Sequence, residues 1–134
     1  MSEIPGAPMT VLVVDDDIEL RQSIRALLEY RGFMVLEAGS GEESESVIGS
    51  FEAPIDVVLM DIHLPDGWGA TIAHRLRALR PEMATVFATG FAADDPILAS
   101  GLNHVDFRLQ KPFTGADLVA TLRDAVEAHR TDSG

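Results

Sequence analysis

The chain of 134 residues contains no cysteine and has few basic residues. The lack of cysteine excludes disulfides, thiolate zinc sites, iron–sulfur clusters and a cysteine nucleophile. Only 10 Lys and Arg residues stand against 22 Asp and Glu residues, and the formal net charge is −12, which opposes direct binding to nucleic acid. No apolar run reaches the roughly 18 residues that span a membrane, and residues 1–6 lack the features of a signal peptide. These absences predict a cytoplasmic protein without membrane insertion, whose partners are proteins or metal cations.

The composition predicts one globular domain. Hydrophobic residues make up 46% and charged residues 24%, which are typical values for a folded domain, and no internal repeat or linker is visible. We expect a flexible leader at 1–9, which contains two prolines and a glycine, one domain at 10–130 and a polar tail at 131–134.

Short apolar runs alternate with segments of helical periodicity along the chain. This alternation predicts a parallel sheet that is covered by helices on both faces. The expected strands are 10–14, 33–37, 55–60, 85–88 and 105–110. The expected helices run from about 20 to 30, 41 to 50, 72 to 80, 92 to 100 and 118 to 130, the last one fraying into the tail.

Polar residues follow four of the five predicted strands directly. Asp15 and Asp16 come after the first strand, Asp61 after the third, Thr89 after the fourth and Lys111 after the fifth. In open parallel sheets the ligand site lies beyond the carboxyl ends of the strands. We therefore expect these five residues to converge on one edge of the sheet.

Three carboxylates, a hydroxyl and an ammonium group define a particular chemistry. Carboxylate oxygens without His or Cys are ligands that suit Mg²⁺. A divalent cation beside a lysine neutralises a phosphoryl group during transfer, and a carboxylate is itself a nucleophile that forms an aspartyl-phosphate. We expect the Thr89 hydroxyl to bind a phosphoryl oxygen.

The sequence resembles a response-regulator receiver domain from about Met9 to Arg130. Intervals of 45, 28 and 22 residues separate Asp16, Asp61, Thr89 and Lys111, as in that family. The resemblance implies an α/β flavodoxin-like fold, with a doubly wound five-stranded parallel sheet in the order 2-1-3-4-5. The motifs that carry it are VLVVDDD (11–17), DVVLMDIHLPDG (56–67), VFATG (86–90) and KPF (111–113).

The same resemblance implies a role for each residue of the predicted site. Asp61 is expected to accept a phosphoryl group from a phosphohistidine on a sensor histidine kinase or a histidine phosphotransfer protein. Phosphorylation is expected to switch the conformation of the domain, which a downstream protein target then recognises. The domain is expected to catalyse its own phosphorylation and dephosphorylation, with no separate substrate, and the Lys111–Pro112 bond is expected to be cis. Thr89 and Lys111 are expected to contact the phosphoryl group, and Mg²⁺ is expected to be held by Asp15, Asp16, Asp61 and the main-chain carbonyl of His63.

Other residues have simpler structural interpretations or depart from the family. Asp17 is expected to cap the first helix rather than to bind metal, and Trp68 is expected to be a lid or packing residue. Phe91 is a candidate shield of the phosphoryl group. Arg108 stands where many receivers carry Tyr or Phe, and strand alternation sends it and Phe107 to opposite faces.

Two alternative functions remain open from the sequence. One is a haloacid-dehalogenase-like phosphatase with Asp15 as nucleophile, which leaves Asp61 unexplained. The other is a receiver-like interaction module that is never phosphorylated, which the departure at Arg108 supports. The run RLQKPF (108–113) resembles receivers of hybrid histidine kinases, so a stand-alone regulator and a receiver from a larger protein also both remain open.

Overall fold

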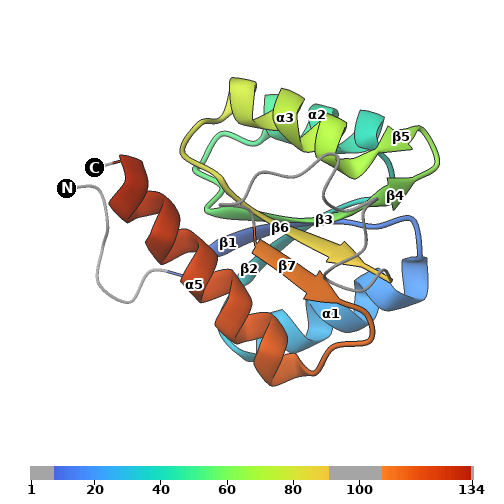
Figure 1. The fold of residues 1–134 in the computed structure, drawn as a ribbon, viewed down its shortest axis with the longest axis vertical. Helices are drawn as coiled ribbons and strands as arrows, with labels where there is room; N and C mark the ends of the chain where they lie inside the picture. Colours follow the sequence, from blue (N-terminus) through green and yellow to red (C-terminus); the bar gives the residue numbers. More distant parts are fainter. Residues whose placement is uncertain (1–7, 91–106, 134) are drawn as a thin grey trace.

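A computed structural model describes residues 8–90 and 107–133. Within these ranges the chain forms a five-stranded parallel sheet and a small antiparallel hairpin, with helices on both faces of the sheet (Figure 1). The sheet strands are β1 (Thr10–Val14), β2 (Met34–Ala38), β3 (Val57–Asp61), β6 (Ala84–Thr89) and β7 (Phe107–Gln110). The hairpin consists of β4 (His63–Leu64) and β5 (Gly67–Trp68), and the helices are α1 (Ile18–Tyr30), α2 (Gly41–Ser50), α3 (Gly69–Leu79) and α5 (Gly115–Ser133).

The large sheet has the strand order β2-β1-β3-β6-β7 among the described residues. This is the predicted order 2-1-3-4-5, and it confirms the flavodoxin-like doubly wound fold. From β1 the chain adds β2 toward one edge of the sheet, and it then adds β3, β6 and β7 in turn toward the other edge. The carboxyl ends of β1 and β3 therefore flank the switch point, where such sheets bind ligands.

Two hydrophobic clusters cover the two faces of the sheet. In β1, Val11 and Val13 join the cluster on the side of α1 and α5, while Leu12 and Val14 join the cluster on the side of α2 and α3 (Figure 1). All four side chains are fully buried. This two-sided burial explains why the strand reads as a continuous apolar run without polar alternation.

Local capping residues mark the starts of α1 and α2, and α1 begins two residues before the expected start at about 20. The Asp17 carboxylate accepts a hydrogen bond from the Leu20 N–H at 3.1 Å, and the Ser40 hydroxyl accepts one from the Glu43 N–H at 3.1 Å. Gly32, two residues beyond the end of α1, has φ of +93°, a left-handed conformation that favours glycine at a helix end. Asp17 is thus confirmed as a cap.

Several element boundaries differ from the prediction. The strands β2 and β3 begin one and two residues later than expected, β6 is longer at both ends, and α5 continues through Ser133. The β4–β5 hairpin was not predicted, because two-residue strands are too short to show a period. The expected helix at 92–100, the first residues of the fifth strand and Phe91 lie outside the described residues. None of the described helices is long and apolar enough to cross a membrane.

Candidate functional site

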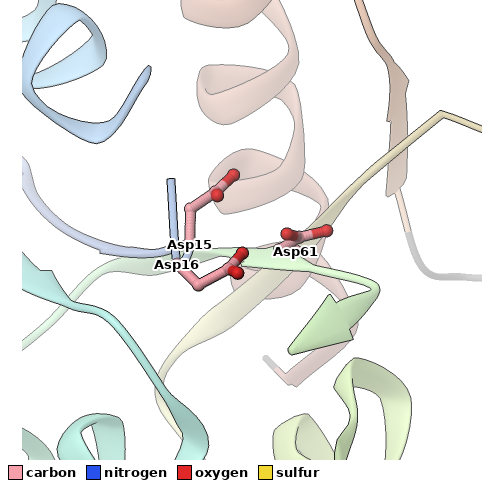
Figure 2. A group of neighbouring side chains, drawn as sticks. All are labelled: Asp15, Asp16 and Asp61. Atoms are coloured by element: carbon pink, nitrogen blue, oxygen red, sulfur yellow. The ribbon is translucent and has the colours of Figure 1, made fainter. Parts of the chain in front are cut away.

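The carboxyl ends of β1 and β3 bring three carboxylates together. Asp61 is the last residue of β3, and Asp15 and Asp16 directly follow β1, whose Val14 pairs with Met60 of β3. Carboxylate oxygens of the three aspartates lie within 4.8 Å of one another, and Figure 2 shows their side chains gathered beyond the strand ends. Asp15 and Asp61 are buried, while Asp16 is exposed. The predicted convergence of these three residues is confirmed.

Lys111 reaches this acidic cluster from β7, two strands away from β3. Its Nζ donates a hydrogen bond to Asp15 Oδ2 at 3.0 Å and lies 3.7 Å from Asp61 Oδ2. Its main-chain N–H donates to the carbonyl of Thr89 at 2.7 Å, which holds the lysine backbone against the end of β6. Thr89 is itself buried there. The cluster thus contains three carboxylates and one ammonium group, and keeps a net negative charge.

The pKa of Asp61 is raised above its ordinary value. Burial of the carboxylate is the largest cause, and repulsion by Asp15 adds to it, while Lys111 and the His63 N–H act in the opposite direction. Burial lowers the pKa of Lys111, but its hydrogen bond to Asp15 and the attraction of Asp61 outweigh this effect, so its pKa is raised. The lysine therefore stays charged, and the excess negative charge favours a bound cation.

The main-chain N–H and both carboxylate oxygens of Asp15 form hydrogen bonds. Its N–H donates to the carbonyl of Ala38 at 3.1 Å. Its Oδ1 accepts from the N–H of Asp17 at 2.9 Å, and its Oδ2 accepts from Lys111. The buried carboxylate is therefore held in place by groups of the protein itself.

The segment after Asp61 folds back as the β4–β5 hairpin. The His63 N–H donates to Asp61 Oδ1 at 3.2 Å, and the His63 ring meets the Trp68 ring edge-on, with centroids 5.0 Å apart. Trp68 also packs partly buried against the cluster of α2 and α3. A Cβ atom at Gly69 would lie 2.2 Å from the carbonyl oxygen of Asp61. Only glycine therefore allows α3 to begin directly against the main chain of Asp61.

Arg108 stands where many receivers carry an aromatic residue, and it points to the opposite face of the sheet from Phe107, as predicted. Arg108 pairs with Phe87 in the register of β6 and β7 and shares its face of the sheet, whereas Phe107 packs on the opposite face against the cluster of α1 and α5. The alternation of the two neighbours is confirmed. The Lys111–Pro112 peptide bond is cis, as the resemblance implies.

Two residues near the site were not predicted to contribute to it. Asp66, in the hairpin turn, accepts hydrogen bonds from the N–H groups of Gly41 at 2.8 Å and Glu42 at 2.9 Å, which lower its pKa. It thereby joins the hairpin to the first turn of α2. Arg21 of α1 donates to the carbonyl of Asp15 at 2.7 Å. Helical spacing places Arg21 on α1, but no local signal in the sequence identifies either contact.

A doubly wound parallel sheet with an acidic cluster and a lysine at its switch point defines the class of this protein. Residues 11–123 match the response regulator receiver domain, and the chain belongs to that family. It is 32% identical over 123 residues to the probable transcriptional regulatory protein TcrX of Mycobacterium tuberculosis, a match that covers 92% of this chain and 52% of TcrX. It is 29% identical over 126 residues to the sensor kinase CckA of Brucella abortus, covering 94% of this chain and 13% of CckA.

The fold agrees with solved receiver structures over almost their whole length. The crystal structure of a response regulator receiver protein from Sinorhizobium medicae has a TM-score of 0.79 and 30% identity, and the match covers 91% of this chain and 97% of that one. The chain spans only about half the length of TcrX and about an eighth of that of CckA. Membership of the family makes this a domain of two-component signalling. Receiver domains bind Mg²⁺ at an acidic pocket and interact with histidine kinases or phosphotransfer proteins.

Proposed function

We propose that this domain accepts a phosphoryl group on Asp61 from a phosphohistidine donor, in a Mg²⁺-dependent reaction, and changes conformation as a result. The observation that carries the proposal is the cluster of Asp15, Asp16 and Asp61 with Lys111 in hydrogen-bond contact. The donor set consists of hard carboxylate oxygens, which fits Mg²⁺. Mg²⁺ would be held by these three side chains together with the main-chain carbonyl of His63.

The geometry favours Asp61 over Asp15 as the nucleophile. Both carboxylate oxygens of Asp15 already accept hydrogen bonds, from Asp17 and Lys111. Asp61 ends the central strand, and its Oδ2 lies 3.7 Å from the Lys111 ammonium group. An oxygen of the ionised Asp61 would form a bond to phosphorus while the bond from phosphorus to the histidine nitrogen breaks. The same site would later hydrolyse the aspartyl-phosphate, without turning over a separate substrate.

The charges on the phosphoryl oxygens would be balanced by groups that the strands already position. Lys111 would keep its ammonium group beside the transferring phosphoryl group, and the Thr89 hydroxyl would bind one of its oxygens. Mg²⁺, when bound, would supply further positive charge that stabilises the phosphoryl oxygens during transfer. Such preorganised charge contributes strongly to transfer because it need not be rearranged during the reaction.

The conformational change would follow from the charge that the phosphoryl group adds. A phosphoryl oxygen on Asp61 competes with Asp15 for Lys111, whose main chain is tied to Thr89. A shift of this lysine and threonine would therefore bias the carboxyl ends of β6 and β7 toward a second state. The exposed Arg108, in place of an aromatic residue, would give this second state a different surface from that of other receivers.

We also propose that the partners are proteins. A phosphohistidine-bearing kinase or phosphotransfer protein would load Asp61, and a downstream protein target would recognise the phosphorylated state. The net charge of −12 opposes direct contact with nucleic acid. We propose a cytoplasmic location, where two-component donors present their phosphohistidine.

Phosphorylation can be tested with Mg²⁺ and a small phosphodonor such as acetyl phosphate. We expect one added phosphoryl group in the intact mass, mapped to Asp61 and absent from Asp61→Asn. An adduct on Asp15 that survives in Asp61→Asn would indicate the phosphatase mechanism instead. The absence of any adduct, also with a beryllofluoride complex as a stable phosphoryl mimic, would favour an interaction module that is not phosphorylated.

A further inference from the structure

An arginine of α1 contacts the main chain of the acidic cluster from outside it. The Arg21 side chain is only 16% exposed. Its NH1 group donates a hydrogen bond to the carbonyl oxygen of Asp15 at 2.7 Å, and its own main-chain N–H donates to the carbonyl of Asp17 at 2.9 Å. Arg21 therefore binds two carbonyls of the three-residue segment that begins with Asp15.

The carbonyl that Arg21 binds belongs to the peptide between Asp15 and Asp16. Because a peptide unit is planar, a bond that fixes its carbonyl also fixes the positions of the Asp16 nitrogen and Cα, from which the Asp16 side chain extends. Asp16 needs this support, because its side chain is exposed and no hydrogen bond or ion pair to its carboxylate is found in the described part of the chain. Asp15, in contrast, is held through its own carboxylate.

Glu37 of β2 orients the Arg21 guanidinium. Its Oε1 accepts a hydrogen bond from Arg21 Nε at 2.8 Å, and its Oε2 accepts one from Arg25 NH1 at 2.7 Å. These hydrogen bonds lower the pKa of Glu37, that from Arg25 most of all. The carboxylate is thus ionised at neutral pH. Its charge-assisted hydrogen bond to Nε holds the Arg21 guanidinium in one direction, while Arg25 holds the carboxylate.

We propose that Arg21, oriented by Glu37, is a positioning residue that keeps Asp15 and Asp16 in the arrangement that binds Mg²⁺. The inference rests on the proposed metal site and adds to it a residue that touches neither metal nor phosphoryl group. Partners of this kind, which orient metal ligands, affect metal affinity by about 10- to 100-fold.

Arg25 offers a matched control on the same helix. It lies one turn beyond Arg21, binds the same Glu37 and makes no contact with the acidic cluster in the described residues. Arg21→Gln and Arg25→Gln each remove one positive charge. Loss of a positive charge near an acidic site strengthens Mg²⁺ binding through electrostatics alone, whereas loss of positioning weakens it. The two explanations therefore predict opposite signs.

The test is a Mg²⁺ titration of the whole chain by calorimetry and by fluorescence of Trp68, the only tryptophan in the sequence. We expect Arg21→Gln to raise the Kd about tenfold, Arg25→Gln to leave it unchanged or lower it, and Arg21→Lys to restore part of the affinity. Circular dichroism and urea titrations check that the variants fold. If Arg21→Gln does not fold, Glu37→Gln is the second variant, and its Kd is expected to rise by a smaller factor.

The outcomes separate this inference from the proposed function. If the wild-type chain binds Mg²⁺ and Arg21→Gln binds it as tightly as Arg25→Gln, Arg21 has no positioning role and the inference is wrong. An unchanged Kd for Glu37→Gln, where that variant carries the test, overturns it in the same way. A wild-type chain that binds no Mg²⁺ overturns the proposed metal site and the inference together.

Discussion

Replacement of Asp61 by asparagine is expected to stabilise the metal-free protein. Asp15 and Asp16 each place a carboxylate oxygen within 4.8 Å of one on Asp61, and Lys111 lies 3.7 Å away. At an effective dielectric constant of about 20, each carboxylate repels the Asp61 charge by roughly 3 kcal/mol, and the lysine attracts it by about 4 kcal/mol. With solvent weakening the effect of the exposed Asp16, we expect Asp61→Asn to raise the free energy of unfolding by about 1–3 kcal/mol at neutral pH.

The gain is expected to depend on pH in a defined direction. Because the pKa of Asp61 is raised in the folded state, the folded protein holds its proton more tightly than the unfolded chain. The wild type therefore loses stability relative to Asp61→Asn as pH rises from the ordinary value of 3.8 through the raised folded value, and the difference is absent below this interval. Above the interval it is fully present.

Urea unfolding in the presence of a chelator, from about pH 3.5 to about pH 8, measures this difference. Added Mg²⁺ is expected to raise the unfolding midpoint of the wild type more than that of Asp61→Asn, because binding to the folded state adds to its stability. A variant that is less stable than the wild type at neutral pH without metal would refute the electrostatic reasoning. So would a stability difference that is the same at both ends of the pH range.

Three further predictions concern single residues. Lys111→Met is expected to slow phosphorylation of Asp61 by about 100-fold, measured by a mass-spectrometric time course; an unchanged rate would mean that the lysine does not stabilise the transferring group. Gly32→Ala is expected to reduce the free energy of unfolding by about 1 kcal/mol because of the left-handed φ of +93°, and an equal urea midpoint would contradict this. Asp66→Asn is expected to lower the urea midpoint and to speed amide hydrogen exchange at Gly41. The wild type should lose its advantage over Asp66→Asn as pH falls through the lowered pKa of Asp66, because only the ionised carboxylate contributes; an advantage that persists in acid would contradict this cause.

The place of the site was predictable because of how a parallel sheet is built. The central strands β1, β3 and β6 show largely apolar runs, and the polar residues that follow parallel strands must lie at the same edge of the sheet. Asp15, Asp61 and Lys111 therefore converge although up to 96 positions separate them. A second rule, that successive side chains of a strand point to opposite faces of the sheet, predicted the opposite faces of Arg108 and Phe107.

The β4–β5 hairpin was not predictable in this way. His63 and Trp68 pair across a turn formed by Pro65 and Asp66, and this segment reads only as a loop from the sequence. The close contact of Gly69 with Asp61 also leaves no periodic signal, since a glycine near a turn has several explanations. These features depend on tertiary contacts that form only when β3 and α3 pack together.

The helix α2 is held at both ends by side chains from other parts of the chain. Its sequence, GEESESVIGS, combines two glycines and three serines, which are weak helix formers. Asp66 binds its first N–H groups, and the Arg80 guanidinium binds the carbonyls of Ile48, Phe51 and Ala53 at its other end.

These partners lie 24 to 32 positions away from the groups that they bind. The contact of Arg21 with Asp15 is of the same kind, because a side chain from one element satisfies main-chain groups of another. Such contacts have no period and no fixed spacing, since the distance in sequence depends only on the lengths of the intervening elements. Hydrophobic periodicity therefore determines which residues reach the edge of the sheet. Side-chain to main-chain hydrogen bonds, which only the folded structure reveals, determine how those residues are oriented once they are there.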